Sequence, residues 1–230
     1  IVSDDEACAS LPLIDMTKMI ADGPTGNGDG TWTIAYELTA TNSGDADGEY
    51  DLADDLRYGA GIEIANAYVA TWPDGVDINT DWTGQGDAGA VENIIATDVT
   101  LGAQESHAYR INVIVSLDED IIAPGALECP EPGSGGSGGL ANGAELVHNG
   151  QMQEDDVCAA LPLIDITKSL SGTVDRVEGE QGVYDATYQI VVTNAGAGEG
   201  VYDLDDALAP GEGVEVVGVQ QVSSEDVPPA

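Results

Sequence analysis

The chain contains one long sequence motif twice, and this internal repeat constrains its fold more than any other feature. The segment ACASLPLIDMTKMI at residues 7–20 returns as VCAALPLIDITKSL at residues 157–170. Further matches follow in the same order: IAYELTATNSG (34–44) with ATYQIVVTNAG (186–196), and YDLADDL (50–56) with YDLDDAL (202–208). Repeats of this length indicate tandem domains.

The phase of the repeat predicts the domain organisation. Residues 1–8 correspond to the tail of a preceding repeat, residues 9–158 to one complete repeat, and residues 159–230 to the first half of the next. Two explanations stay open for the half repeat. The sequence is a slice of a longer tandem protein, or a neighbouring chain completes the half repeat by strand addition.

The local pattern is that of β-strands throughout. TWTIAYELTATN (31–42) and HAYRINVIVSL (107–117) alternate apolar and polar residues, as half-buried strands do. GIEIANAYVA (61–70) and AELVHNGQ (144–151) are further expected strands, and clusters of Gly, Asn, Asp and Pro separate them. No window has a helical period. The sequence therefore predicts an all-β protein of tandem immunoglobulin-like β-sandwich repeats.

Three motifs together resemble a known family. A first strand that ends in T-K, a later Y-x-(I/L)-x-(V/A)-T-N-x-G strand, and a following D-x-L with G-x-G-(V/I) recur in both halves. This pattern is similar to the DUF11-type repeats of bacterial and archaeal cell-surface and secreted proteins, and the resemblance covers nearly the whole chain. It implies a non-catalytic component of a stalk, adhesin or filament on the cell surface or outside the cell.

The charge of the chain limits its partners. Its 43 acidic and 5 basic residues give a net charge of −38, which repels nucleic acid and anionic membrane surfaces. No stretch approaches the roughly 18 apolar residues of a membrane-spanning helix. The expected partners are cations, copies of the chain or adjacent repeats in a fibre, and surface glycans, while most of the acids are expected to be solvated.

The three cysteines predict one disulfide inside the complete repeat. Cys129 and Cys158 flank a Gly- and Ser-rich segment, and Cys8 is the repeat equivalent of Cys158. We expect a Cys129–Cys158 bridge, with Cys8 bonded to a preceding repeat, and hence an oxidising compartment. Three free thiols are the alternative.

Each repeat places its single lysine within an apolar row. Lys18 alternates in phase with Ile14, Met16 and Ile20, and Lys168 repeats this pattern. A buried lysine loses its proton readily and is then a nucleophile, so Lys18 could form an isopeptide bond with Asn142, with Glu37 or Asp51 as the candidate acid. The alternatives are a lysine turned outward by a bulge or by its long stem, and an ion pair with Asp15 or another carboxylate.

Two acidic clusters suggest Ca²⁺, which prefers oxygen ligands. The first is the loop of Asp45, Asp47, Glu49, Asp51, Asp54 and Asp55, although the second repeat lacks the first two of these acids. The second cluster lies at the expected junctions between repeats and comprises Asp4, Asp5, Glu6, Glu154, Asp155 and Asp156. Calcium is accordingly the one cofactor that the sequence suggests.

Catalytic motifs are missing from the sequence, and the two histidines occur in no metal-binding or triad pattern. The segment TWPDGVDINTDWTGQGD (71–87) has the composition of an exposed aromatic loop, which makes Trp72 and Trp82 candidate ligand contacts. The leading function is a structural or adhesive module. The alternatives are a Ca²⁺-dependent glycan-binding module and an accessory domain of a secreted enzyme.

Overall fold

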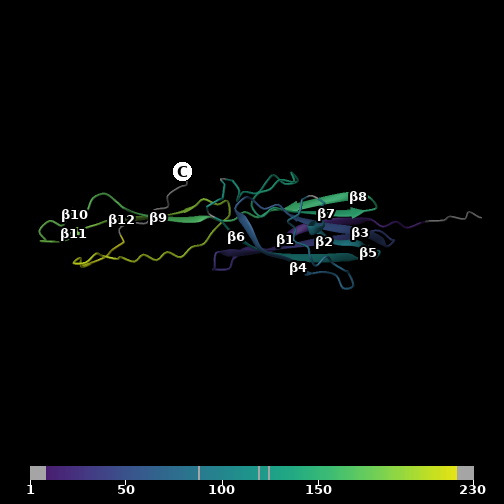
Figure 1. Ribbon diagram of the computed structural model, residues 1–230, viewed down its shortest axis with the longest axis horizontal. Coiled ribbons are helices and arrows are strands. Elements are labelled where there is room, and N and C mark those ends of the chain that lie inside the picture. Colours follow the sequence, from purple (N-terminus) through teal and green to yellow (C-terminus); the bar gives the residue numbers. More distant parts are fainter. Residues whose placement is uncertain (1–8, 88, 119, 124, 222–230) are drawn as a thin grey trace, which may run out of the picture. The chain divides into compact units, whose positions relative to one another are not determined.

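The computed structural model describes residues 9–87, 89–118, 120–123 and 125–221 (Figure 1). The regular secondary structure of the described part consists of β-strands and one short 3-10 helix, η1 (Val91–Asn93). None of its helices is long and apolar enough to cross a membrane. The chain divides into two compact units. Unit 1 comprises Ile1–Leu161 with Gly196–Gly198, and unit 2 comprises Pro162–Ala195 and Glu199–Ala230.

Unit 1 contains two four-stranded antiparallel sheets that enclose its core. The first sheet has the order β1 (Ile14–Gly26), β2 (Thr31–Asn42), β6 (Ser106–Leu117) and β4 (Ile62–Thr71). The second has the order β5 (Ile94–Leu101), β3 (Gly48–Leu56), β7 (Asn142–His148) and β8 (Gln151–Val157). This arrangement confirms the predicted all-β, immunoglobulin-like sandwich.

Strict alternation of side chains builds the core. In β6, Tyr109, Ile111, Val113 and Val115 are fully buried while the residues between them are partly exposed. In β3, every even-numbered residue from Gly48 to Leu56 is buried. Because successive side chains in a strand point to opposite faces, the sequence pattern alone places each of these residues.

One expected strand is a hairpin. The segment 144–151 was predicted to be continuous, but β7 ends at His148 and β8 begins at Gln151, and Figure 1 shows the two strands side by side. Asn149 and Gly150 both have positive φ, of 50° and 70°. Asn-Gly is a typical two-residue hairpin turn, because both residues tolerate this backbone conformation.

The first and last strands of unit 1 meet through side chains. Gln153 Oε1 accepts a hydrogen bond from the Met16 amide at 3.2 Å, and Asp155 Oδ2 accepts one from the Lys18 amide at 2.7 Å. Gln153 Nε2 also donates to the Ile14 carbonyl at 2.8 Å. The outer backbone groups of edge strand β1 are thus partnered by β8, which protects an edge that could otherwise pair with another chain.

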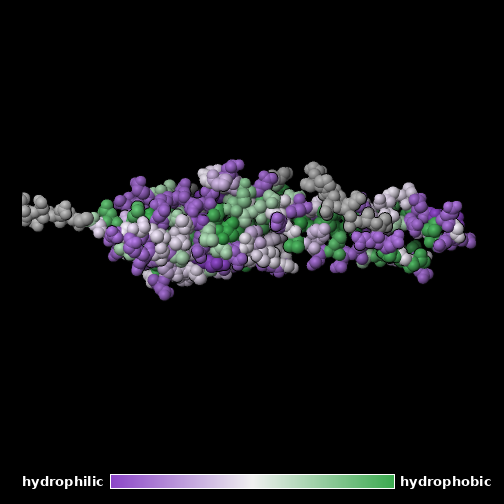
Figure 2. Space-filling view, turned by 180° about the vertical axis from the view of Figure 1, so that it is seen from behind, coloured by the Kyte–Doolittle hydropathy of each residue, from purple (hydrophilic) through white to green (hydrophobic). Residues whose placement is uncertain are grey.

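Unit 2 repeats the first strand pair of unit 1 in the same register. Strand β9 (Ile164–Leu170) pairs with β12 (Tyr188–Asn194), and β10 (Asp175–Arg176) pairs with β11 (Tyr184–Asp185). Ile164 faces Asn194 and Lys168 faces Ile190, as Ile14 faces Asn42 and Lys18 faces Leu38. Large apolar side chains such as Ile166 and Tyr188 are exposed in this unit, and Figure 2 shows hydrophobic atoms among the hydrophilic ones on the molecular surface.

Cys129 and Cys158 form the predicted disulfide, with Cα atoms 5.7 Å apart and a sequence separation of 29. The bridge joins the end of β8 to the chain that precedes the Gly- and Ser-rich segment. Cys8, expected to bond to a preceding repeat, lies outside the described residues.

Replacing both Cys129 and Cys158 by serine is expected to lower the free energy of unfolding of unit 1 by about 3 kcal/mol, because the bridge restricts the unfolded chain. Urea denaturation followed by tryptophan fluorescence measures this change, since all three tryptophans lie in unit 1. Cys8→Ser is the matched control and is expected to unfold as the parent chain does. Equal stability of the double variant and the control would show that the bridge contributes nothing.

Candidate functional site

Three polar side chains are buried together between the sheets of unit 1. Lys18 comes from β1, Asp54 from β3 and Asn142 from the start of β7, with relative exposures of 6%, 0% and 0%. Lys18 Nζ donates a hydrogen bond to Asp54 Oδ2. We call these three residues the Lys–Asp–Asn cluster.

Strand geometry explains why the three residues meet. Lys18 shares the inward face of β1 with Ile14 and Met16, and Asp54 shares the inward face of β3 with Tyr50, Leu52 and Leu56. In the β3–β7 pairing Asp54 faces Ala144 and Leu56 faces Asn142, so Asp54 and Asn142 are diagonal neighbours on one face. Such diagonal pairs lie within reach of one another across a sheet.

Burial dominates the electrostatics of the cluster. It lowers the pKa of Lys18, against the opposing effect of the Asp54 carboxylate. It raises the pKa of Asp54, against the opposing effects of Lys18 and of the neighbouring Asn142 amide. Both shifts favour a proton on Asp54 and a neutral amine on Lys18, because a low-dielectric interior penalises the charged forms.

The aromatic ring of Tyr36 lies close to the Lys18 amine. Lys18 Nζ is 5.5 Å from the centre of the Tyr36 ring, and the Tyr36 hydroxyl donates to the Leu140 carbonyl at 2.9 Å. Leu140 is two residues before Asn142, so Tyr36 contacts both the lysine and the chain that leads into β7. Tyr36 therefore helps to hold the two strands in place around the cluster.

Several polar atoms of the cluster have no hydrogen bond in the described structure. They are Asp54 Oδ1 and both amide atoms of Asn142, Oδ1 and Nδ2. The Asn142 amide is near enough to lower the pKa of Asp54, but the contact falls outside hydrogen-bond geometry. Buried polar groups in native proteins are nearly always paired, so these unpaired atoms need an explanation.

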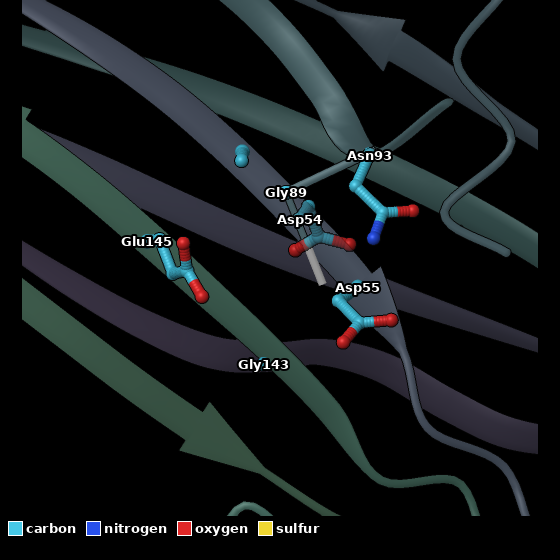
Figure 3. A pocket seen from close by; sticks show the side chains of 7 residues that line it. Asp54, Asp55, Gly89, Asn93, Gly143 and Glu145 are labelled. Atoms are coloured by element: carbon cyan, nitrogen blue, oxygen red, sulfur yellow. The ribbon is translucent and has the colours of Figure 1, made fainter. Parts of the chain in front are cut away.

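The segment between β4 and β5 lies along the edge of β3 beside the cluster, where the Leu56 amide donates to the Gly84 carbonyl at 2.7 Å. Trp82 is only 4% exposed, and its indole N–H donates to the Asp54 backbone carbonyl at 3.2 Å. Figure 3 shows a small recess that is lined by Asp55 and Glu145 of the second sheet and by Asn93 of η1. The recess is the outer surface of the strands that carry Asp54 and Asn142.

The same lysine and aspartate are paired in unit 2. Lys168 Nζ donates to Asp206 Oδ1 and lies 5.0 Å from the centre of the Tyr188 ring. In the repeat, these residues correspond to Lys18, Asp54 and Tyr36. Their side chains are more exposed than in unit 1, at 34% for Lys168 and 39% for Asp206, so only unit 1 buries the arrangement in the part that the structure describes.

The two acids predicted from the sequence, Glu37 and Asp51, are not the partners of Lys18. Glu37 is on the outward face of β2, opposite Met19 and Arg110. Asp51 is exposed on β3, where its Oδ1 accepts a hydrogen bond from the Asp98 amide at 2.8 Å. The partner of Lys18 is Asp54 and not Asp15, because Asp15 is outward-facing in β1. The missed signal was the apolar row of Tyr50, Leu52 and Leu56, which includes Asp54 at even spacing.

The first acidic cluster is not a single loop. Glu49, Asp51, Asp54 and Asp55 belong to β3, and the alternation of the strand sends Asp54 into the core and the others outward. Asp47 accepts the Ala103 amide at 3.0 Å, Asp45 lies 3.4 Å from Gln104 Nε2, and Asp55 pairs with Arg57 at 2.9 Å. These acids already have protein partners.

The second acidic cluster is not on a connector either. Glu154, Asp155 and Asp156 belong to β8, where Asp155 accepts the Lys18 amide and Asp156 accepts the Gly133 amide at 3.0 Å. Asp4, Asp5 and Glu6 lie outside the described residues. Within the described ranges no group of three or more His, Cys, Asp or Glu side chains is arranged to hold a metal ion, and calcium binding stays an untested prediction.

The two candidate tryptophans differ. Trp82 was expected on an exposed loop, but it is buried against β3, so it cannot contact a ligand at the surface. Trp72 is 44% exposed and follows the end of β4. The prediction of an aromatic ligand site thus retains only one of its two residues.

The fold and the cluster define an immunoglobulin-like sandwich with a buried polar group between its sheets. No family model and no curated protein matches the chain. Among solved structures, the full-length major pilin SpaD from Corynebacterium diphtheriae is similar, with 13% identity and a TM-score of 0.33. The match covers 74% of this chain and 39% of that pilin, so the chain spans well under half of its length.

Proposed function

We propose that the chain is a non-catalytic structural module of an extracellular filament, stalk or large surface adhesin. The observation that carries this proposal is the contact between the first and last strands of unit 1. Along β1 from Met16 to Lys18 the partners in β8 advance from Gln153 to Asp155. The two strands therefore run parallel, although they belong to different sheets.

Parallel end strands suit a module under tension. Force applied to the chain on either side of unit 1 enters at the start of β1 and leaves at the end of β8, so it pulls the two strands in opposite directions along their length. The contacts between β1 and β8 are then loaded together rather than one after another, and the Lys–Asp–Asn cluster adds a contact from β1 to β3 and β7. This geometry supports a mechanical role.

The other features fit the same function. The disulfide between Cys129 and Cys158 is typical of proteins outside the cell, and the net charge of −38 keeps such a protein soluble. The proposed partners are further copies of the repeat, in the same chain or in neighbouring chains of a fibre. Membership in the DUF11-type repeats stays a prediction, and no specific observation favours glycan binding or an accessory role in an enzyme.

Location in the source cells tests this proposal. Antibodies raised against the purified chain are expected to label extended structures on intact, unpermeabilised cells in electron micrographs. Brief protease treatment of those cells is expected to remove the label, while a cytoplasmic marker protein is unaffected. Labelling that requires permeabilised cells would contradict the proposed function.

A further inference from the structure

We propose that Lys18 and Asn142 become joined by an intramolecular isopeptide bond between Lys18 Nζ and Asn142 Cγ, with Asp54 as the acid that promotes it. The bond would connect the first strand of the first sheet to the third strand of the second. It concerns the covalent chemistry of unit 1 and does not depend on where the protein is located.

The three groups needed for the reaction are in one buried place. Asp54 contacts the amine of Lys18 through Oδ2, and its other oxygen, Oδ1, has no partner. The Asn142 amide is the diagonal neighbour of Asp54 on the same face of the sheet. A reaction between groups held in this way avoids the entropic cost of bringing them together.

The unpaired Asn142 amide is the second observation. Neither of its polar atoms has a hydrogen bond, although the residue is fully buried. Leaving such groups unpaired inside a protein is destabilising, because they lose their hydrogen bonds to water without replacement. The isopeptide bond has one N–H where the Asn142 side chain had two. Its carbonyl oxygen accepts a hydrogen bond from the protonated oxygen of Asp54, and its N–H donates to the other oxygen.

The environment supplies the reactive forms of both partners. Burial lowers the pKa of Lys18 and raises that of Asp54, which favours a neutral amine beside a protonated carboxyl group. A neutral amine has the free lone pair that a nucleophile needs. A protonated carboxyl group can donate to the amide oxygen and stabilise the charge that develops there.

The reaction balances without a co-reactant. The Lys18 Nζ lone pair attacks Asn142 Cγ, and the Asn142 oxygen takes the developing negative charge while Asp54 donates a hydrogen bond to it. One amine proton then passes by way of Asp54 to Nδ2. The Cγ–Nδ2 bond breaks and ammonia leaves, so the protein loses one ammonia and Asp54 ends in its starting protonated form.

The repeat gives independent support. Unit 2 preserves the lysine, the aspartate and the tyrosine at the same repeat positions, and Lys168 contacts both Asp206 and Tyr188. The contact of the lysine with a carboxylate and with a tyrosine ring is therefore a property of the repeat and not of unit 1 alone.

Intact mass of the full chain, measured after reduction and denaturation, is the first test. The protein is expected to be lighter than its sequence by one ammonia. Asn142 precedes Gly143, and an Asn-Gly pair can lose ammonia by cyclising on its own backbone, so the mass alone does not identify the bond.

Trypsin digestion identifies the isopeptide bond. Lys18, Arg57, Arg110, Lys168 and Arg176 are the only cleavage sites in the sequence, and an acylated Lys18 is not cleaved. The bond predicts one branched product that joins residues 1–57 to residues 111–168. A free 1–18 peptide and a linear 111–168 peptide, in place of the branched product, would overturn the proposal.

Variants assign the roles of the residues. Lys18→Met and Asp54→Asn are each expected to show the full sequence mass and no branched peptide. Lys168→Met and Asp55→Asn are the matched controls, and both are expected to retain the loss of ammonia and a branched peptide. In Lys168→Met the second arm of that peptide runs from residue 111 to residue 176, because the cleavage site at position 168 is lost. Because mass is measured on denatured protein, the Lys18→Met result is readable even if that variant folds poorly. If Lys18→Met still loses ammonia, the loss comes from cyclisation of Asn142, and the proposed cross-link is wrong.

Discussion

Replacing Asp54 by alanine is expected to lower the free energy of unfolding of unit 1 by about 3–5 kcal/mol, because it leaves Lys18 buried without its partner. The Lys18 side chain has no exposed surface, so in this variant its amine loses the carboxyl group that it hydrogen-bonds and cannot reach water instead. The variant also lacks the carboxyl group that we propose promotes the cross-link, and that loss adds to the effect. Urea denaturation followed by tryptophan fluorescence measures the change.

Two further variants distinguish the effect on stability of losing one partner of the Lys18–Asp54 pair from the effect of its burial. Lys18→Met with Asp54→Leu is expected to recover much of the lost stability, because apolar side chains of similar volume often replace a buried pair at little cost. Asp206→Ala removes the corresponding, partly exposed pair of unit 2 and is expected to cost unit 2 less than about 1 kcal/mol. Circular dichroism measures this change, because all three tryptophans lie in unit 1. The interpretation fails if Asp54→Ala is no more destabilising than Asp206→Ala.

Replacing Trp82 by alanine is expected to cost about 3–5 kcal/mol, because it leaves a large cavity over β3. The change also removes the indole N–H that donates to the Asp54 carbonyl at 3.2 Å, so the β3 backbone at the cluster loses a hydrogen bond. Thermal unfolding followed by circular dichroism measures the loss.

Trp72→Ala is the matched control for this prediction. Trp72 is 44% exposed, and substitutions at such surface positions usually change stability by about 0.5 kcal/mol or less. Similar losses for the two variants would show that Trp82 is not the core residue that the structure describes.

Much of the fold follows from alternation in the sequence. The rows of apolar residues in β2 and β6 predict both the strands and their buried faces, and the repeat predicts a second strand pair with the same register. Lys18 and Asn142 could also be placed on inward faces in this way, because each shares its parity with apolar neighbours.

The contacts between the sheets could not be predicted from such local patterns. Asp54 was grouped with nearby acids because they are close in sequence, whereas the alternation of β3 sends it alone to the interior. The acids of β8 were assigned to a connector because the Asn149–Gly150 turn was missed. Trp82 was expected to be exposed because its loop is polar, and only the folded chain shows that the loop covers β3.

Pulling the full chain by its two ends in a single-molecule force experiment tests most directly whether unit 1 is a locked mechanical module. The account predicts that the segment between Lys18 and Asn142 never contributes to the extension, because the cross-link carries the force past it. The Asp54→Asn variant is expected to release the part of this segment from residue 19 to residue 129 in one step, because the Cys129–Cys158 bridge still carries the force past residues 130–157. Release of the same segment from the unsubstituted chain would contradict the account.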